Sequence, residues 1–186
     1  MGGEEIDQAV RRVLNGLGAA YEMVPCDPAL ADTDAFCQAY GYSLRDSANT
    51  IVVAGKARPP LYAACVVLAD TRLDVNRTVK QRLGVRRASF ASAEEAAALT
   101  GMMIGGVTVF ALPPHLPIWV DERVMARERI ILGAGSRSWK VVASPDVLRR
   151  LPNVEIVESL AVERPRPEGN GDAGSGDGVT PPSPAV

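Results

Sequence analysis

Three glycines fall within six residues of the segment Thr100–Thr108, which reads Thr-Gly-Met-Met-Ile-Gly-Gly-Val-Thr. Gly101, Gly105 and Gly106 let a backbone turn sharply and bring its N–H groups close to a ligand. Such N–H groups can hold a carbonyl oxygen or a phosphate, as oxyanion holes and anion nests do. The spacing matches neither the P-loop nor the Gly-x-Gly-x-x-Gly pattern of dinucleotide sites. The segment therefore indicates an oxyanion-binding loop, while composition alone leaves an ordinary connecting loop open.

A second glycine turn, Gly133-Ala134-Gly135-Ser136-Arg137, lies between two predicted strands. A turn of this composition is typical of a plain hairpin. Its small residues could equally form one wall of a binding pocket, so both interpretations stay open for Gly135 and Ser136.

Side-chain chemistry is restricted by the composition. The only histidine, His115, lies in the proline-rich stretch 113–117, which is typical of a surface turn. The three cysteines include no Cys-x-x-Cys pair, so they predict neither a structural zinc site nor a disulfide framework. We therefore expect no metal and no cofactor.

The 186 residues suit one domain, with 47% hydrophobic and 23% charged side chains. No apolar run approaches the roughly 20 residues of a membrane-spanning helix, and the acidic N-terminus is unlike a signal peptide. These features favour a cytoplasmic protein that does not contact membranes. Residues 51–100 carry eight basic and four acidic side chains, with six of the basic ones between Arg72 and Arg87. This cluster indicates either a local nucleic-acid contact or a solvated helix face.

The predicted elements that must position these residues are helices and strands in irregular alternation. Helices are expected over 6–17, 30–40, 74–83, 92–99 and 144–151, and strands over 21–24, 50–54, 64–68, 87–90, 106–110, 117–120, 129–132, 139–143 and 154–157. This order favours an α+β fold with a mixed sheet, although periodicity alone leaves α/β open. We expect one folded domain over residues 4–161 and a disordered Gly/Pro-rich tail over residues 162–186.

Six motifs in order resemble the YbaK / prolyl-tRNA synthetase insertion-domain family of aminoacyl-tRNA deacylases. They are Ala91-Ser92-Ala93-Glu94-Glu95, Thr100-Gly101, Gly105-Gly106-Val107-Thr108, Leu116-Pro117-Ile118-Trp119-Val120-Asp121-Glu122, Gly133-Ala134-Gly135-Ser136 and Ser144-Pro145-Asp146-Val147-Leu148. Two earlier segments, Thr50–Val53 and Arg72–Val75, occupy the places of the family's first core strand and its following turn. The resemblance covers roughly residues 5–160.

The resemblance implies an α+β domain with a mixed, partly barrel-like sheet flanked by helices. It also implies a pocket that receives the aminoacylated 3′ end of tRNA and hydrolyses the ester, with an aminoacyl-tRNA synthetase as a further expected partner. Carried onto this sequence, it places Asn49, Gly105 and Gly106 at the catalytic positions. The substrate-binding residues that it implies are Thr50, Thr100, Gly101, Val107, Thr108, Gly135 and Ser136.

The sequence departs from the family pattern at two positions. Asn49 stands where the family has its hallmark lysine, and a neutral amide replaces a point charge with directional hydrogen bonds. Lys56 could replace that lysine only if the following hairpin brings it back. Val109 stands where the family has a proline after the glycine loop.

Three hypotheses for the function follow from these observations. The first is a trans-editing hydrolase that deacylates mischarged tRNA. The second is a binding module that retains the pocket for an aminoacyl-tRNA or a small nucleotide but has lost the chemistry. The third is a domain that only associates with a translation partner.

Overall fold

The structure is a computed structural model and describes residues 2–164. The helices are α1 Gly3–Gly16, η1 Pro28–Leu30, α2 Thr33–Tyr40, η2 Val75–Val79, α3 Lys80–Arg82, α4 Ala93–Thr100, α5 Glu122–Met125 and α6 Asp146–Arg149. The strands are β1 Tyr21–Pro25, β2 Ala48–Gly55, β3 Leu61–Leu68, β4 Thr71–Leu73, β5 Ala88–Phe90, β6 Ile118–Asp121, β7 Ile130–Gly133, β8 Trp139–Ala143, β9 Val154–Val157 and β10 Ala161–Glu163.

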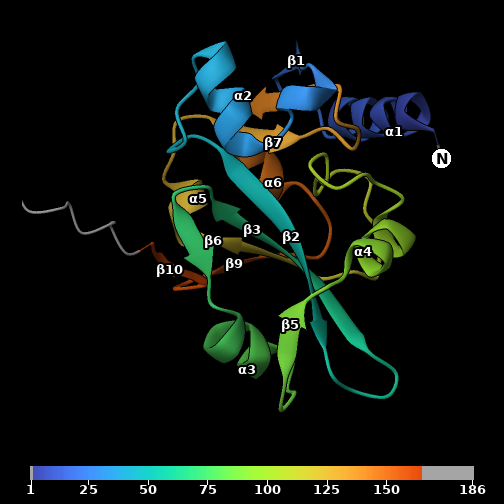
Figure 1. Ribbon diagram of the computed structural model, residues 1–186, viewed down its shortest axis with the longest axis vertical. Coiled ribbons are helices and arrows are strands. Elements are labelled where there is room, and N and C mark those ends of the chain that lie inside the picture. Colours follow the sequence, from blue (N-terminus) through green and yellow to red (C-terminus); the bar gives the residue numbers. More distant parts are fainter. Residues whose placement is uncertain (1, 165–186) are drawn as a thin grey trace, which may run out of the picture.

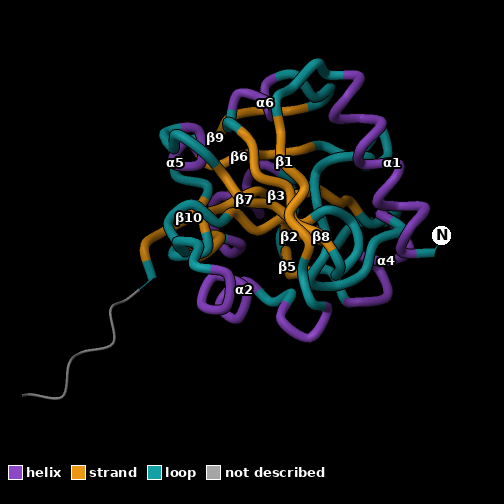
Figure 2. The backbone as a smooth tube through the Cα atoms, turned by 90° about the horizontal axis from the view of Figure 1, so that it is seen from above, coloured by secondary structure: helices purple, strands orange, loops and turns teal. Residues whose placement is uncertain are grey.

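The strands form three sheets, with β2 and β3 at the centre of the molecule and helices around its periphery (Figures 1 and 2). The five-stranded sheet has the order β5-β2-β3-β6-β9; it is antiparallel from β5 to β3 and parallel from β3 to β9. The other sheets are antiparallel, with the orders β1-β8-β7 and β10-β4. The expected α+β fold with a mixed sheet is confirmed, and none of the described sheets closes into a barrel.

Strand β3 separates two hydrophobic cores, because successive side chains of a strand point to opposite faces. Ala64 and Val66 pack into the core beneath α1, while Cys65 and Val67 pack into the core that contains Trp119. All four β3 side chains are 1% exposed or less. This sheet therefore has apolar cover on both faces, and its polar groups lie at edges and ends.

Local sequence signals explain several element boundaries. Asp74 begins the η2 turn by accepting hydrogen bonds from the backbone N–H groups of Arg77 and Thr78. Ser92 and Glu95 form the reciprocal capping box expected at the start of α4. The predicted helix over 74–83 is present as the π-helical turn η2 followed by α3.

The predicted strand over 106–110 is wrong, because this segment is a loop in the structure. Its backbone bonds belong to turns: the Gly106 N–H donates to Met103 O at 2.9 Å, and Gly106 O accepts from the Gly135 N–H at 2.7 Å. The strands β4 and β10 and the helix α5 are short elements that the sequence patterns did not predict.

Strand β10 reaches Glu163 and so crosses the expected domain end at residue 161. The rest of the expected tail, residues 165–186, lies outside the described residues. Within residues 2–164, no helix has the length and apolar character needed to cross a membrane.

Candidate functional site

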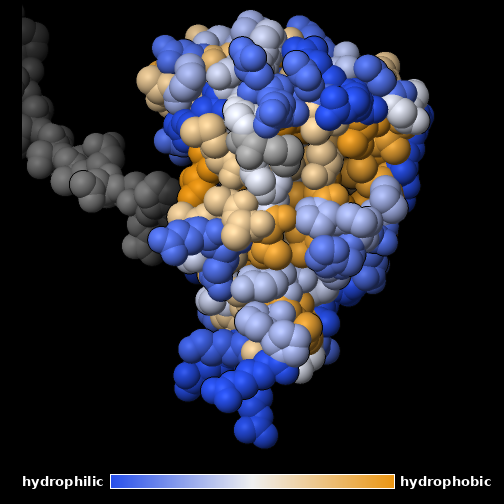
Figure 3. Space-filling view, turned by 90° about the vertical axis from the view of Figure 1, so that its right-hand side faces the viewer, coloured by the Kyte–Doolittle hydropathy of each residue, from blue (hydrophilic) through white to orange (hydrophobic). Residues whose placement is uncertain are grey.

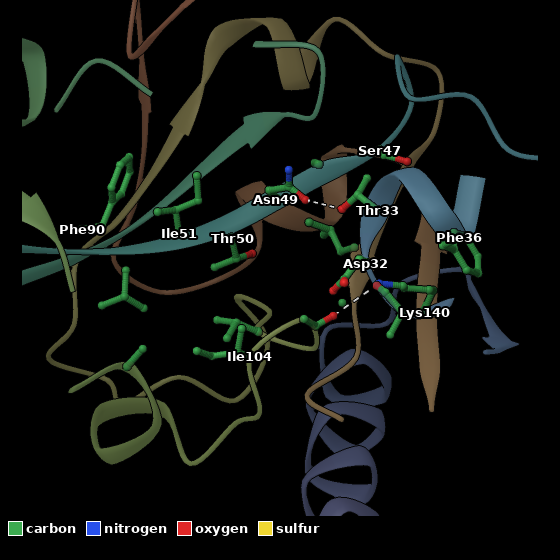
Figure 4. Close-up of a pocket in the computed structure, with 18 of the residues that line it drawn as sticks. Asp32, Thr33, Phe36, Ser47, Asn49, Thr50, Ile51, Phe90, Ile104 and Lys140 are labelled. Atoms are coloured by element: carbon green, nitrogen blue, oxygen red, sulfur yellow. Dashed lines mark hydrogen bonds between the residues drawn. The ribbon is translucent and has the colours of Figure 1, made fainter. Parts of the chain in front are cut away.

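A cavity of about 400 Å³ lies beside the first half of β2. Its walls come from β2, the start of α2, the loop at residues 104–107, β7 and the connection from β5 to α4 (Figure 4). Lys140 of β8 closes one side. The cavity therefore gathers segments that are far apart in the sequence.

The cavity exists because β5 covers only part of β2. The two strands pair at Val53–Gly55, and the Ala91 N–H donates to the Val52 carbonyl at 2.9 Å. Main-chain groups of an antiparallel strand alternate between its two sides, so Thr50 directs its N–H and C=O toward the same edge as Val52. No described strand pairs with Thr50 on that side. The edge of β2 is thus open where it meets the cavity.

Asn49 lines the cavity and is held by the first residue of α2. Its side-chain Oδ1 accepts a hydrogen bond from Thr33 Oγ1 at 2.8 Å (Figure 4). Because this bond uses the amide oxygen, the two N–H donors of the Asn49 amide remain for a ligand.

Thr50 brings a hydroxyl group to the cavity wall. Its Oγ1 is buried and has no hydrogen-bond partner among the described residues. In Figure 4 it lies on the side of β2 that faces Ile104. Buried polar groups in folded proteins are almost always hydrogen-bonded, so an unpaired hydroxyl on a cavity wall is a candidate ligand contact.

The glycine loop divides into a free part and an engaged part. Within the described chain, the N–H groups of Gly105 and Val107 have no intramolecular partner, and both residues line the cavity. The Gly106 N–H donates to Met103 O at 2.9 Å, and Gly106 O accepts from Gly135 N at 2.7 Å. Gly105 and Val107 can therefore donate to a ligand, whereas both backbone polar groups of Gly106 are already bonded.

Gly106 has a packing requirement that explains its residue type. A Cβ atom at this position would lie 2.2 Å from the carbonyl oxygen of Ser136, which belongs to the backbone. Only glycine permits the loop to approach the β7–β8 turn this closely. Gly106 does not line the cavity.

Lys140 supplies a buried ammonium group to the cavity. Its Nζ donates to Ala31 O at 2.6 Å and to Gly105 O at 3.4 Å, and it lies 5.4 Å from the centre of the Phe36 ring. Burial lowers the pKa of Lys140 below its usual value of 10.5, and the positive charge of Arg137 acts in the same direction. The lysine links the start of α2 to the glycine loop.

Asp32 is the carboxylate at the cavity wall, and it already has a partner. Arg137 Nη1 lies 3.1 Å from Asp32 Oδ1 and also donates to Ile104 O at 3.2 Å. Arg137 therefore links the segment before α2 to the glycine loop.

The other residues predicted for the site surround the loop without lining the cavity. Thr100 Oγ1 donates to Ala96 O at 2.7 Å and accepts from Met102 N, which secures the end of α4. Gly101 ends that helix with a φ of 68°, a left-handed conformation that favours glycine. Thr108 is fully buried, and its Oγ1 has no partner among residues 2–164.

Gly135 and Ser136 lie behind the loop, against α1. A Cβ atom at Gly135 would lie 2.7 Å from Ile6, and its φ is +100°. Ser136 donates through Oγ to Asp7 Oδ2 at 2.8 Å and through N–H to Asp7 Oδ1 at 3.2 Å. Asp7 and Ser136 are both buried, so this pair joins α1 to the turn.

Of the ten predicted residues, four line the cavity: Asn49, Thr50, Gly105 and Val107. Sequence reasoning missed Thr33 and Lys140. A lone charged residue inside the apolar strand 139–143 was the available signal for Lys140. Thr33 gives no such signal, because its contact with Asn49 spans 16 residues. Lys56, the alternative source of an ammonium group, follows the far end of β2 and does not line the cavity.

The profile of the aminoacyl-tRNA editing domain family matches residues 27–151, which is more than half of the chain. The chain belongs to this family. The match includes every residue of the cavity wall described above, so the cavity lies within the editing domain. Membership assigns the chain a role in tRNA editing.

Solved structures share the fold of this editing domain at low sequence identity. The crystal structure of the hypothetical protein APE2540 has a TM-score of 0.71 and 23% identity, over 80% of this chain and 97% of that chain. A candidate trans-editing enzyme for prolyl tRNA synthetase also has a TM-score of 0.71, with 21% identity over 82% of this chain and 95% of that one. No curated protein sequence matches the chain.

No cluster of three His, Cys, Asp or Glu side chains that could hold a metal ion occurs within residues 2–164. The donors at the cavity wall of this editing domain are amide, hydroxyl and ammonium groups. Such groups bind carbonyl oxygens and phosphates.

Proposed function

We propose that this protein is a trans-editing hydrolase that deacylates mischarged aminoacyl-tRNA in the cavity beside β2. The observation that carries the proposal is that Gly105 and Val107, whose backbone N–H groups have no partner among the described residues, both line the cavity of an aminoacyl-tRNA editing domain. Fixed backbone donors suit a carbonyl oxygen that gains negative charge during ester hydrolysis.

The reaction adds water to the carbonyl carbon of the ester that links the amino acid to the terminal ribose. The carbonyl oxygen becomes an oxyanion, which the N–H groups of Gly105 and Val107 stabilise. The attacking water releases one proton to solvent, and the intermediate then breaks the bond to the ribose oxygen, which takes up a proton from solvent in return. The products are a free amino acid and a tRNA with a free ribose hydroxyl.

The other polar groups of the cavity hold the substrate or the loop. The Asn49 amide donates to the aminoacyl end, and its Oδ1 stays bonded to Thr33. The Thr50 hydroxyl contacts the same end of the substrate. Lys140 acts through Gly105, whose carbonyl it binds, and is therefore a positioning residue.

Side-chain selection follows from the size of the cavity. About 400 Å³ must hold a terminal adenosine and the amino acid together, which favours small amino acids. Steric exclusion of one or two methylene groups discriminates by about 10- to 200-fold.

A deacylation panel tests the proposal. The purified protein is incubated with tRNAs charged with Ala, Ser, Cys, Thr or Pro, beside the variants Asn49→Ala and Asn49→Lys. We expect turnover of at least one species by the natural protein and its loss in Asn49→Ala. Activity that occurs only in Asn49→Lys would instead indicate the binding module, with the pocket retained and the chemistry absent.

A further inference from the structure

A group of exposed basic residues lies next to the cavity, at the end of the β2–β3 hairpin. The Lys56 N–H donates to Arg87 O at 2.9 Å, so the residue after β2 and the residue before β5 lie side by side. Lys56, Arg58, Arg86 and Arg87 are exposed, and none of them forms an ion pair within residues 2–164. We call these four residues the basic tip.

The basic tip accounts for only part of the basic cluster seen in the sequence. Arg82 is ion-paired with Glu155 and lies over the Trp119 ring at 5.0 Å. Arg72 lies on β4, paired opposite Val162 of β10. Arg82 therefore has a structural role, and Arg72 belongs to a different sheet from the strand that follows Arg87. Lys56 and Arg58, from the β2–β3 hairpin, complete the basic tip.

A second hollow lies at the basic tip. Its volume is about 570 Å³, and its lining includes Lys56, Arg58, Ser89 and Glu95. Residues 90–93, which follow Ser89 directly, line the first cavity. The segment from β5 to the first turn of α4 therefore contributes to the lining of both hollows.

Glu95 is the acidic residue of the second hollow, and its carboxylate is engaged. It accepts hydrogen bonds from Ser92 N at 2.8 Å and from Tyr62 Oη at 3.0 Å. Four cations in and beside the hollow outnumber this carboxylate, so the hollow favours an anionic ligand.

An exposed aromatic ring stands between the basic tip and the cavity. Phe90, at the end of β5, is 56% exposed and lines the cavity, and Ile104, also on the cavity wall, is 55% exposed. At a rise of about 3.3 Å per residue of extended chain, the Cα atoms of Arg87 and Phe90 are about 10 Å apart. Figure 3 shows the lower end of the molecule, where Figure 1 places the hairpin turn and the start of β5, as strongly hydrophilic beneath a hydrophobic region.

An aromatic ring beside a row of cations is the combination that binds single-stranded nucleic acid. Bases stack on the ring, and the cations follow the phosphates. We propose that Phe90 and the basic tip form a track for the single-stranded 3′ end of tRNA. Phe90 stacks a base adjacent to the terminal nucleotide, and the basic tip binds the phosphates that precede it. This inference rests on the proposed function, because it takes the terminal nucleotide to lie in the cavity.

Binding of uncharged tRNA tests the track without requiring hydrolysis. The affinity of a 5′-labelled tRNA is measured by fluorescence anisotropy across a range of salt concentrations. The double variant Arg86→Ala/Arg87→Ala is compared with Arg12→Ala/Arg149→Ala, which removes the same charge from exposed positions on α1 and α6. We expect about tenfold weaker binding only for the first pair. For this variant the slope of the logarithm of the affinity against the logarithm of the salt concentration should decrease in magnitude by about 1.4, since each phosphate contact on a single strand contributes about 0.7.

Phe90 is tested with two substitutions and two RNAs. Phe90→Ala should weaken the binding of intact tRNA about tenfold. Phe90→Trp should retain the affinity, because tryptophan stacks on bases as phenylalanine does. A tRNA trimmed of its single-stranded 3′ nucleotides should bind the natural protein and Phe90→Ala equally.

Any of three results would overturn the track. They are equal effects of the two arginine pairs on tRNA affinity, equal affinity of the natural protein for trimmed and intact tRNA, or equal affinity for duplex DNA and intact tRNA. The track and the proposed function fail separately. Selective binding without hydrolysis of any charged tRNA would contradict the hydrolase alone. Hydrolysis with unchanged kcat/KM in the arginine and Phe90 variants would contradict the track alone.

Discussion

The ammonium group of Lys140 lies 3.4 Å from the carbonyl oxygen of Gly105, inside the cavity of the editing domain. The same group donates to Ala31 O at 2.6 Å, so one side chain ties the glycine loop to the segment that precedes α2. Where the family pattern has a lysine at the start of the first core strand, this chain has Asn49. Its cavity obtains a positive charge from β8 instead.

Replacing Lys140 should reduce catalysis more than stability. In Lys140→Met the carbonyl of Gly105 loses its donor, and we expect kcat to fall about tenfold or more, which corresponds to about 1.4 kcal/mol of transition-state stabilisation. Removing a buried charge that has no carboxylate partner within 4 Å limits the loss of folding free energy to about 1 kcal/mol. Steady-state kinetics and urea denaturation measure the two effects. Lys80→Met on α3 is the control, and equal kcat values for both variants would refute the positioning role.

The hydrogen bond from Thr33 to Asn49 should orient the Asn49 amide. In Thr33→Val the hydroxyl donor is absent at nearly constant volume, so the amide can rotate and direct its oxygen toward the substrate. We expect kcat/KM for deacylation to decrease about fivefold, since one neutral hydrogen bond is worth about 1 kcal/mol. Thr33→Ser keeps the hydroxyl and should behave like the natural protein. Retained activity in Thr33→Val with loss of activity in Thr33→Ser would show that the methyl group, not the hydrogen bond, matters.

Gly106 should be indispensable for folding rather than for contact with substrate. A Cβ atom there would lie 2.2 Å from Ser136 O, so Gly106→Ala should lower the free energy of unfolding by about 3 kcal/mol. Gly16→Ala is the matched control, because nothing lies within 4 Å of a Cβ at that position. It should raise stability by about 0.5 kcal/mol. A thermal melt in which the two variants coincide would contradict this packing account.

Ser136 should contribute to stability through Asp7. Ser136→Ala removes a donor from a buried carboxylate and should cost about 2 kcal/mol of unfolding free energy. Because Ser136 does not line the cavity, kcat/KM should stay unchanged at a temperature where the variant is fully folded. The contrary outcome, reduced kcat/KM with an unchanged melting temperature, would place Ser136 at the substrate.

Cys65 should make the fold sensitive to alkaline pH. Burial in β3 raises the pKa of the Cys65 thiol from 9.0 to about 12. The pKa is higher in the folded state, so the thiol's contribution to stability is complete below pH 9 and is lost as the pH rises toward 12. Between pH 8 and pH 10 the natural protein should lose about 1.4 kcal/mol relative to Cys65→Ala, as urea denaturation can measure. Parallel pH profiles of the two proteins would contradict this burial effect.

Local patterns in the sequence predicted most of the fold because they report local physics. The apolar spacing of Ile6, Val10 and Leu14 predicted α1, and all three residues are buried in the structure. The β2–β3 hairpin and the capping box of α4 followed from equally short patterns. The segment 106–110 was predicted as a strand from its apolar residues, whereas in the structure Gly106 packs against the backbone of the β7–β8 turn, a contact that no local pattern records.

The cavity could be predicted only in part. Asn49, Thr50, Gly105 and Val107 lie in motifs that carry the family resemblance, and all four line the cavity. Gly106 and Ser136 belong to the same motifs, yet Gly106 packs against the Ser136 backbone and Ser136 bonds to Asp7, away from the cavity. Residue type and order do not show which face of a loop meets the cavity. That depends on the crossing of segments far apart in the sequence.

Single-turnover deacylation, with the protein in saturating excess over charged tRNA, tests the central claim most directly, because neither product release nor weak tRNA binding limits the rate. The rate is measured for each species of the panel with the natural protein, with Asn49→Ala and without protein. The account predicts hydrolysis above the uncatalysed rate for a tRNA charged with a small amino acid, and at least a tenfold lower rate in Asn49→Ala. Rates equal to the uncatalysed rate for every species, or an unchanged rate in Asn49→Ala, would contradict it.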